Sequence, residues 1–593
     1  MEYPILNVKQ KYTQMTDAFL GYNHNLRTAE SEFYDMKNMT SDYYPVLTPR
    51  GKRGIYVDTH DVNGIIAKDT LCYVDGTDFV IRDIHVDMGL SPEIYGRTKT
   101  LISMGSYVII MPDRKYINTM EIGKNEFEHG DIDATFTSTA DVKFQMCTLT
   151  GDAYENATIS ATAPSNPKNN QLWIDTSTTP HTLKKYAESS SMWVAIATTY
   201  IKVSSPGIAK GFKQYDGVKI SGIVGDGASL NGSQALWGCH ESEDGKSDYI
   251  IIVGILDKVT TQTVAQGKIT IERKMPDMAH IVESNNRLWG CKYGVSEDGT
   301  VVNEIYACKL GDFKNWNCFM NLSTDSYAAS CGTDGPFTGA INHLGYPLFF
   351  KENCIHKVYG NYPSNYQIQT TTCRGVQKGS ERSLAIVNET LYYKSTNSVC
   401  AYDGSLPVEV STALGDAKYS KAVAGAHGNK YYISMRSADG TYHLFVYDTA
   451  KGMWHKEDNL RALSFCSFDN EMYAIDHKKD IITLLGSGTP TEEKVPWMVE
   501  TGLIGMTLPD MKYISKLQLR MALDVGSNVT ISLQYDSIGD WEQVCQMTST
   551  SLRSFTVPIL PRRCDHFRIR IDGEGGCKIY SITKTLEQGS DVS

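Results

Sequence analysis

The sequence contains few residue patterns that could support catalysis. It has no HExxH zinc motif, no GxSxG nucleophile turn, no Walker-type phosphate loop and no GxGxxG after a strand. Residues 222–227 are rich in glycine, but no helix follows that could hold a phosphate, so a hairpin turn is favoured. Residues 242–245 and 296–299 both read Ser-Glu-Asp-Gly, without the spaced ligands and distal glutamate of a calcium loop. We therefore expect no catalytic residue, no metal site and no cofactor.

Two pairs of residues are better candidates for contacts with other proteins. Tyr43 and Tyr44 precede a proline in the N-terminal segment, and aromatic side chains supply much of the contact area of interfaces. Packing within their own chain is an equally good interpretation. Arg562 and Arg563 stand at the entrance of a predicted strand, either as an interface pair or in a local ion pair with Asp565. These four residues are the candidate interface residues.

The composition argues against several broad classes of protein. The chain has 593 residues and a net charge of −11, which disfavours wrapping a nucleic acid but not lining a channel through which DNA passes. Residues 1–12 lack the apolar run of a secretory signal, and the longest apolar run, residues 249–256, is too short to span a bilayer. The 14 cysteines include no CxxC pair, so buried free thiols are favoured over disulfides.

Alternating apolar and polar residues predict a chain built almost entirely of β-strands. A turn residue followed by an apolar, aromatic strand recurs seven times, at residues 69–74, 105–110, 286–289, 345–350, 388–393, 429–433 and 470–475. The spacing from Leu391 to Tyr431 is 40 residues, and that from Tyr431 to Met472 is 41. A period of about 40 with several strands in each unit predicts a β-propeller of six to eight blades.

The repeat divides this all-β chain into five parts. They are an extended N-terminal arm (1–50), the first part of the β-propeller (51–130), inserted small β modules (131–275), the rest of the β-propeller (276–488) and a C-terminal β-sandwich (489–593). The insertion is expected because the period disappears there, and the sandwich because a separate set of alternating strands begins after a short linker. Residues 236–239 echo residues 288–291, so the end of the insertion stays open.

Several loose motifs resemble one protein family. Residues 25–39 and the stretch Pro-Val-Leu-Thr-Pro-Arg-Gly-Lys-Arg-Gly at 45–54 look like the first segment of phage tail hub or nozzle proteins, sometimes labelled stabilization proteins. Residues 286–290, 310–316, 349–351 and 402–404 are similar to the propeller of that family. Residues 164–193 resemble a small module common in phage structural proteins. The C-terminal sandwich has no clear counterpart in the family.

The resemblance implies a structural virion component that is not an enzyme. In such families six copies form a ring that continues the portal and adaptor channel of a tail, and DNA leaves the head through it without sequence recognition. The implied partners are further copies of the chain in a hexamer, portal and adaptor proteins, and other tail proteins or fibres. The arm would reach a neighbouring copy. The chain would be made in the host cytoplasm and act in the phage tail.

Other functions are compatible with the same patterns. One is a baseplate or tail-tip protein close to the host receptor. Another is a carbohydrate-binding or carbohydrate-cleaving propeller, where retaining cleavage would need two carboxylates about 5 Å apart in the central funnel. The sequence does not place such a pair. A third is a cytoplasmic interaction scaffold of the kelch type.

Overall fold

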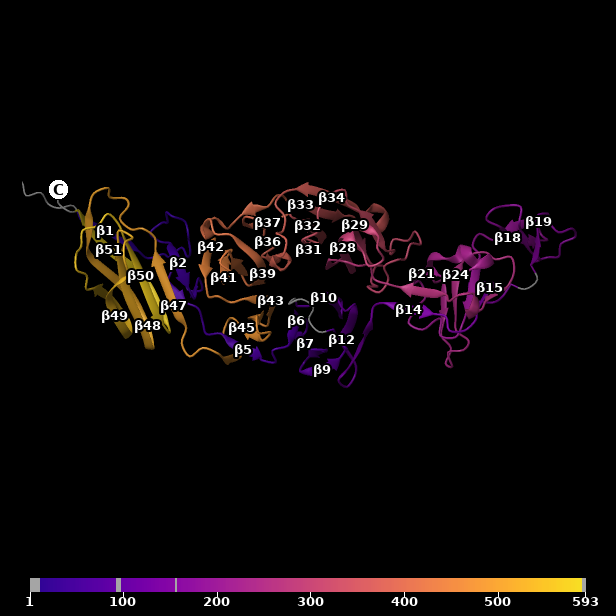
Figure 1. Cartoon of the computed structure of the whole chain (residues 1–593), viewed down its shortest axis with the longest axis horizontal. Coiled ribbons are helices and arrows are strands. Elements are labelled where there is room, and N and C mark those ends of the chain that lie inside the picture. The colour runs from indigo at the N-terminus through magenta and orange to yellow at the C-terminus, as the bar shows by residue number, and fades with distance from the viewer. Residues whose placement is uncertain (1–10, 92–97, 155–156, 589–593) are drawn as a thin grey trace, which may run out of the picture.

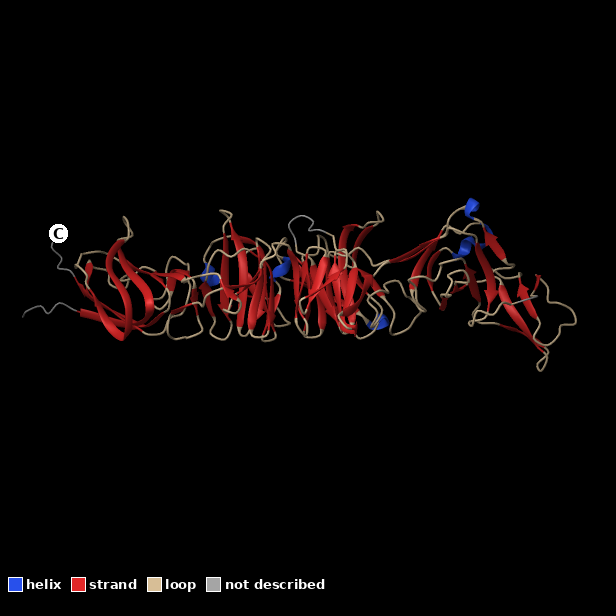
Figure 2. Cartoon of the chain, turned by 90° about the horizontal axis from the view of Figure 1, so that it is seen from below, coloured by secondary structure: helices blue, strands red, loops and turns tan. Residues whose placement is uncertain are grey.

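The chain folds almost entirely into β-sheet. The computed structural model describes residues 11–91, 98–154 and 157–588. Figure 1 shows a β-sandwich at one end of the long axis, a propeller in the middle and the insertion at the other end. Helices are confined to short 3-10 turns (Figure 2), namely η1 (Gly225–Leu230), η2 (Val264–Gln266), η3 (Pro363–Asn365), η4 (Glu381–Ser383) and η5 (Thr412–Leu414). The predicted fold class is confirmed.

Seven antiparallel sheets form the propeller, within the predicted range of six to eight blades. In each blade the strands are given from the innermost outward. The two blades before the insertion are blade 1, with β6 (Val62–Ala67), β7 (Leu71–Asp75), β8 (Asp78–Ile81) and β9 (Ile84–Asp87), and blade 2, with β10 (Thr100–Met104), β11 (Tyr107–Met111), β12 (Lys115–Gly123) and β13 (Glu126–Asp131).

The other five blades follow the insertion. They are blade 3, with β27 (His280–Ser284), β28 (Arg287–Val295), β29 (Val301–Ala307) and β30 (Tyr327–Ser330); blade 4, with β31 (Gly339–His343), β32 (Tyr346–Lys351), β33 (Cys354–Tyr359) and β34 (Gln367–Thr372); blade 5, with β35 (Ala385–Val387), β36 (Thr390–Lys394), β37 (Val399–Tyr402) and β38 (Val408–Glu409); blade 6, with β39 (Tyr419–His427), β40 (Lys430–Ser437), β41 (Tyr442–Asp448) and β42 (Met453–Lys456); and blade 7, with β43 (Ala462–Phe468), β44 (Glu471–Asp476), β45 (Ile481–Thr483), β5 (Gly54–Val57) and β46 (Thr489–Pro490).

The seven sequence repeats correspond to the second strands of the seven blades. Each of these strands has an apolar central run because neighbouring blades cover both of its faces. In β32, Leu348, Phe349 and Phe350 are all fully buried. The turn before such a strand takes left-handed backbone, as at Asn286 (φ 59°) and Asn470 (φ 61°). Asparagine and glycine adopt this conformation most readily, which explains the turn residue in each repeat.

A strand from the N-terminal part closes the ring of blades. β5 pairs antiparallel with β45, so that Ile55 lies opposite Ile482. Next to it, Val62 and Ile65 of blade 1 share an apolar cluster with Tyr473 and Ile475 of blade 7. The ring therefore cannot open without breaking strand pairing between the two ends of the propeller sequence.

The insertion contains two sheets around one core and a third sheet at its tip. The first is β14 (Ala134–Thr137), β26 (Thr270–Arg273), β21 (Gly217–Ser221) and β22 (Gly232–Ala235); the second is β23 (Gly238–His240), β24 (Tyr249–Val253), β20 (Tyr200–Ser204), β15 (Val142–Cys147) and β25 (Thr260–Gln262); the tip sheet is β16 (Thr158–Ser160), β17 (Leu172–Asp175), β18 (Thr182–Ala187) and β19 (Met192–Ala195). Because β23 to β26 pair only with strands of the insertion, residues 236–273 belong to it and not to a blade.

The C-terminal domain includes strands from the N-terminal segment. Its order is β1 (Lys11–Thr16), β51 (Cys577–Gln588), β48 (Lys512–Tyr535), β50 (Phe567–Glu574), β47 (Pro496–Thr501) and β2 (Phe33–Lys37), with β49 (Glu542–Val557) paired to β48 and a small ladder of β3 (Met39–Thr40) and β4 (Thr48–Pro49) beside it. The expectation of an extended arm therefore needs correction, because β1 and β2 pair with β51 and β47 of the same chain.

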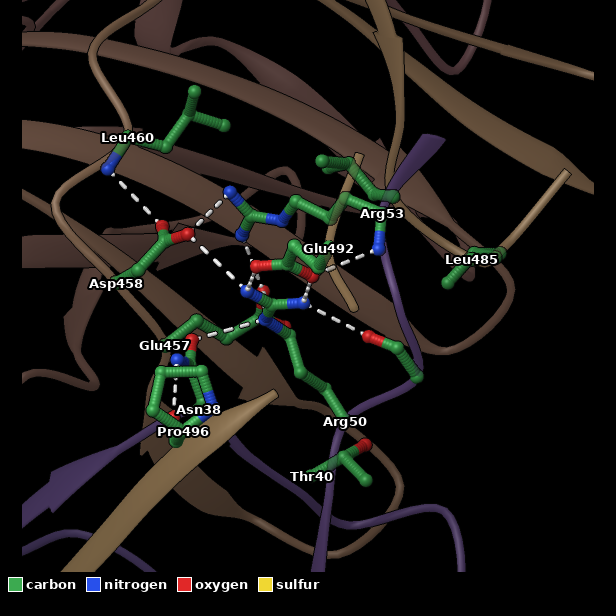
Figure 3. Close-up of polar contacts among 12 residues, drawn as sticks. Asn38, Thr40, Arg50, Arg53, Glu457, Asp458, Leu460, Leu485, Glu492 and Pro496 are labelled. Atoms are coloured by element: carbon green, nitrogen blue, oxygen red, sulfur yellow. Dashed lines mark hydrogen bonds and ion pairs between the residues drawn. The ribbon is translucent and has the colours of Figure 1, made fainter. Parts of the chain in front are cut away.

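A buried cluster of charges lies where the N-terminal segment, the propeller and the C-terminal domain meet (Figure 3). Arg50 donates two hydrogen bonds of 2.8 Å to the carboxylate of Glu492. The guanidinium of Arg53 lies 2.8 Å from the carboxylate of Glu457 and 2.6 Å from that of Asp458. The two arginine side chains are only 4% and 7% exposed. We call these five residues the junction cluster. Pairs this deeply buried are costly to break singly, because a charge is then left without a partner.

Replacing one arginine tests the junction cluster. Arg53→Met removes the 2.8 Å partner of the buried Glu457 carboxylate, which keeps only Arg50 at 3.8 Å, so we expect the free energy of unfolding to fall by about 3–5 kcal/mol. The matched control is Arg82→Met, which removes an exposed pair with Glu121 and should cost about 1 kcal/mol or less. Urea unfolding of both variants gives the comparison, and equal losses would contradict a special role for the cluster.

Acid should loosen the same junction. Burial raises the pKa of the Glu492 carboxyl, but hydrogen bonds from Arg50 and from the Arg53 backbone N–H outweigh it and hold that pKa below its usual range. Such a carboxyl stabilises the fold above its unfolded pKa, and this contribution is lost as the pH falls through the folded pKa. We expect an acid-active protease to cleave residues 485–496 faster below about pH 4. The pH dependence should weaken in Glu492→Gln, and an unchanged profile would contradict the assignment.

Candidate functional site

A pocket opens between blades 3 and 4 of the propeller. Its volume is about 270 Å³, and it is lined by Asn285, Trp289, Gly345, Pro347, Val358, Gly360, Asn361 and Tyr366. These residues come from the β27–β28 and β31–β32 turns, from the strands beside them and from the loop between β33 and β34. We call it the blade 3–4 pocket. Its size is near the lower end of the range for small-molecule sites.

Turns in left-handed conformation form the wall of the pocket. Asn285 has φ 53°, Gly345 φ 79° and Gly360 φ 113°. A Cβ on Gly360 would lie 2.6 Å from the carbonyl oxygen of Asn365, whereas one on Gly345 would meet nothing within 4 Å. Glycine is therefore required at position 360 both by the backbone and by the packing of the loop.

Aromatic rings supply the apolar part of the pocket. The Tyr366 ring stands edge-on to Trp289 at 5.0 Å and to Tyr327 at 5.1 Å between ring centroids. Trp289 is almost fully buried, and its indole N–H donates to the carbonyl of Ser284 at 3.3 Å. Behind Tyr366, the Arg287 guanidinium lies 5.9 Å from the ring centre. The edge-on packing holds the rings in one orientation.

Two side-chain amides supply the polar part. The Asn285 amide donates to the carbonyl of Gly345 at 3.0 Å, which ties the two turns together, and Asn361 is exposed at the rim. None of the lining side chains is charged at neutral pH, and burial raises the pKa of the Tyr366 phenol further. Aromatic faces and uncharged amides suit a ligand with C–H faces and hydroxyl edges. Glycoside hydrolysis would need a pair of carboxylates, and the pocket lining contains none.

The side chain of Arg382 connects blades that are far apart in the propeller sequence. Arg382, in η4 between blades 4 and 5, donates to Thr98 at the start of blade 2 and to the carbonyl of Leu463 in blade 7 at 3.2 Å. Blades 2 and 7 flank blade 1, which lies opposite η4 in a ring of seven. Elsewhere in the propeller, Asp113 pairs with Lys99 at 2.6 Å and Asp277 with Lys292 at 2.6 Å.

The candidate interface tyrosines lie against the C-terminal domain and blade 6. Tyr43 is 59% exposed, with the Lys578 ammonium 5.3 Å from its ring centre. Tyr44 is 40% exposed, with Lys451 at 6.0 Å. The two rings contact their own chain and also expose area to solvent. Packing within the chain and contact with another protein therefore both remain compatible with the structure.

The candidate interface arginines lie elsewhere on the C-terminal domain. Arg562 and Arg563 are exposed, and Arg562 pairs with Glu542 at 2.9 Å rather than with Asp565. Asp565 instead contacts His566 at 3.0 Å. The arginines follow β49 in sequence, whereas the tyrosines sit beside β51, so the two pairs are not parts of one compact site. Their proposed roles stay predictions.

The pocket was not predicted from the sequence. Trp289 and Gly345 belong to two of the repeats, where they were interpreted only as parts of strands and turns. Asn361 and Tyr366 lie in a loop outside the repeated unit, so no pattern marked them. The useful signal was the tyrosine-rich, glycine-containing stretch at residues 359–366. The loop it forms, 360–366, is longer than the matching loops of blades 1, 2, 5 and 6, but shorter than that of blade 3, 308–326.

Several other features bear on function. No set of three His, Cys, Asp or Glu side chains in the described residues is arranged to hold a metal ion. The described part of the chain contains no helix of the length and apolarity that crossing a membrane requires. The 14 cysteines are free, as predicted.

The comparisons with known proteins found enzymes of carbohydrate chemistry. No family model and no curated protein matches the chain. Among solved structures, an exo-β-1,3-galactanase from Phanerochaete chrysosporium is 10% identical, with a TM-score of 0.22, and covers 52% of this chain and 96% of its own. A Trypanosoma rangeli sialidase is 9% identical, with a TM-score of 0.20, over 91% of this chain and 96% of its own.

These neighbours correct one expectation. The prediction that the chain is not an enzyme is contradicted, because the solved structures found are glycoside hydrolases and a sialidase. Likeness at this level does not transfer an activity or a substrate to this chain. The structures named above are not phage tail proteins, and the resemblance to that family stays a prediction.

A pair of glycine substitutions tests the geometry of the pocket wall. Gly345→Ala should cost about 1–2 kcal/mol, from its left-handed backbone alone. Gly360→Ala should cost more, because its Cβ also collides with the Asn365 carbonyl. Thermal unfolding of the two variants measures the difference. Equal losses would show that the β33–β34 loop yields and that the wall is not rigid.

Proposed function

We propose that the chain binds carbohydrate and that the blade 3–4 pocket holds one uncharged sugar residue. The observation that carries the proposal is the combination of the Tyr366 ring, which packs on the buried Trp289, with the Asn285 and Asn361 amides around one cavity. A sugar ring presents C–H groups on its faces, which pack on aromatic rings, and hydroxyls at its edge, which exchange hydrogen bonds with amides. The absence of charge in the lining favours a neutral sugar over an acidic one.

The site is preorganised for such a ligand. Its walls are turns of fixed conformation, and its rings are held by contacts with each other and with blade 3. Binding therefore requires little ordering of side chains, which is a principal cost of association. A single sugar in a small, neutral pocket is expected to bind weakly, with a Kd of about 1 mM, or about −4 kcal/mol.

Titration of the whole chain with a panel of neutral and acidic monosaccharides and disaccharides tests the proposal. Calorimetry should detect binding of a neutral sugar. Asn361→Ala should weaken it about 3- to 10-fold, the worth of one hydrogen bond, and Tyr366→Ala at least about tenfold. Tyr56→Ala removes an aromatic ring far from the pocket and should leave binding unchanged.

Two results would contradict the proposal. One is the absence of binding by every sugar of the panel at millimolar concentration. The other is binding that persists in both Asn361→Ala and Tyr366→Ala, which would place the sugar elsewhere. Because Asn361 is exposed, its substitution should not disturb folding. A loss of binding in this variant would therefore come from the lost contact with the sugar. Release of reducing sugar from the same ligands would separate cleavage from binding.

A further inference from the structure

A second, smaller pocket lies where blade 5 meets the connection to blade 6. Its volume is about 30 Å³, enough for one or two waters or for one monatomic ion such as chloride. The β36–β37 turn forms one wall, and the segment from η5 to the start of β39 forms the other. We call it the blade 5–6 pocket. It shares no lining residue with the blade 3–4 pocket.

Lys394 places a buried positive charge at this pocket. It is the last residue of β36, it lines the pocket, and it is only 3% exposed. Its ammonium donates to the carbonyl of Ser395 and, at 3.3 Å, to that of Thr396. Both acceptors are uncharged, so they do not neutralise the ammonium. An ammonium has three N–H groups, which leaves one of them for a group in the pocket.

The structure contains no counter-charge for this ammonium. Among the described residues that line the pocket, Glu409 alone is acidic, and it pairs with Arg374 at 3.0 Å instead of with Lys394. Burial lowers the pKa of the Lys394 ammonium to about 8, and the like charge of Lys418 acts in the same direction. At pH 7 most of the ammonium therefore still carries its charge. A buried charge without a partner of opposite sign is costly.

Other groups around the pocket suit an anion. Lys418 is exposed and brings a second ammonium to the lining. The hydroxyls of Ser398 and Ser411 are buried and add neutral groups that can donate. The Ser411 hydroxyl accepts from the backbone N–H of Val399 at 2.9 Å, and its own contact with Glu409 is long, at 3.5 Å. Its proton is therefore available to a ligand in the pocket.

We propose that the blade 5–6 pocket binds one chloride-sized anion, which neutralises Lys394. Two ammonium groups face a single carboxylate that is already paired, so the lining is positive and disfavours a cation. The small volume favours a monatomic anion over sulfate or phosphate. The bound anion would link the β36–β37 turn to the start of blade 6. The site is independent of the proposed sugar binding.

Thermal unfolding of the whole chain at fixed ionic strength, with chloride exchanged for gluconate, tests the site. Raising chloride from about 1 to about 200 mM should raise the Tm by about 2 °C, because a ligand of the folded state stabilises that state. Lys394→Met should abolish this response. Lys418→Met, at an exposed position, should weaken chloride binding about 2- to 5-fold. The matched control is Lys124→Met, which removes an exposed charge from the β12–β13 turn and should leave the response intact.

Bromide, which scatters X-rays anomalously, locates the ion directly. Crystals of the whole chain in bromide should show one ion within about 3.5 Å of the Lys394 nitrogen. Three results would overturn the proposal: a parent Tm that does not respond to chloride, an equal response in Lys394→Met, or a bromide peak without any response in solution, which would mean an adventitious ion only. If Lys394→Met does not fold, equal responses of Lys418→Met and Lys124→Met would overturn it.

Discussion

The junction cluster is the interaction on which the arrangement of the propeller and the C-terminal domain depends. Arg50 and Arg53 come from the segment before blade 1, Glu457 and Asp458 from the connection between blades 6 and 7, and Glu492 from the passage into the C-terminal domain. Three carboxylates thus share two guanidinium groups, in a site where the side chains of Arg50, Arg53 and Glu457 are more than nine-tenths buried. Each charge is tolerable there only while its partners are present. The cluster can therefore form only when all three segments have reached their places.

The polar neighbours of the cluster make this requirement stricter. Asn38 accepts a hydrogen bond from Arg50 at 2.9 Å and donates to the carbonyl of Pro496 at 2.7 Å, at the start of β47. The same N-terminal segment then contributes β2 to the C-terminal sheet and β5 to blade 7. Propeller closure and completion of the C-terminal domain are consequently two results of placing one segment. The insertion is held differently, by local contacts of Asn315, whose side chain accepts from the backbone N–H of Gly217 at 2.9 Å and donates to the carbonyl of Tyr215 at 2.7 Å.

These differences explain what could be predicted from the sequence. The second strand of each blade is buried on both faces, which forces an apolar, aromatic run after a turn residue, and this local pattern repeats along the chain. The pairing of β1 with β51 has no comparable sequence pattern. Five of the six residues of β1 are exposed, and their types do not indicate that the partner strand lies near the other end of the chain. The blade 3–4 pocket was missed for a related reason. Its aromatic side chains come from a strand of blade 3 and a loop of blade 4. Only the packing of these two blades in the folded propeller brings Trp289 and Tyr366 together.

The blade 3–4 pocket depends on how two neighbouring blades pack. It is small and neutral, so each chain would hold a single sugar weakly. Asn285 and Trp289 come from blade 3, whereas Gly345 and Tyr366 come from blade 4, so neither blade contains the pocket alone. The hydrogen bond from Asn285 to the carbonyl of Gly345 and the edge-on contact of Tyr366 with Trp289 both cross this boundary. A substitution that separates the two blades would therefore remove the pocket without changing any residue that lines it.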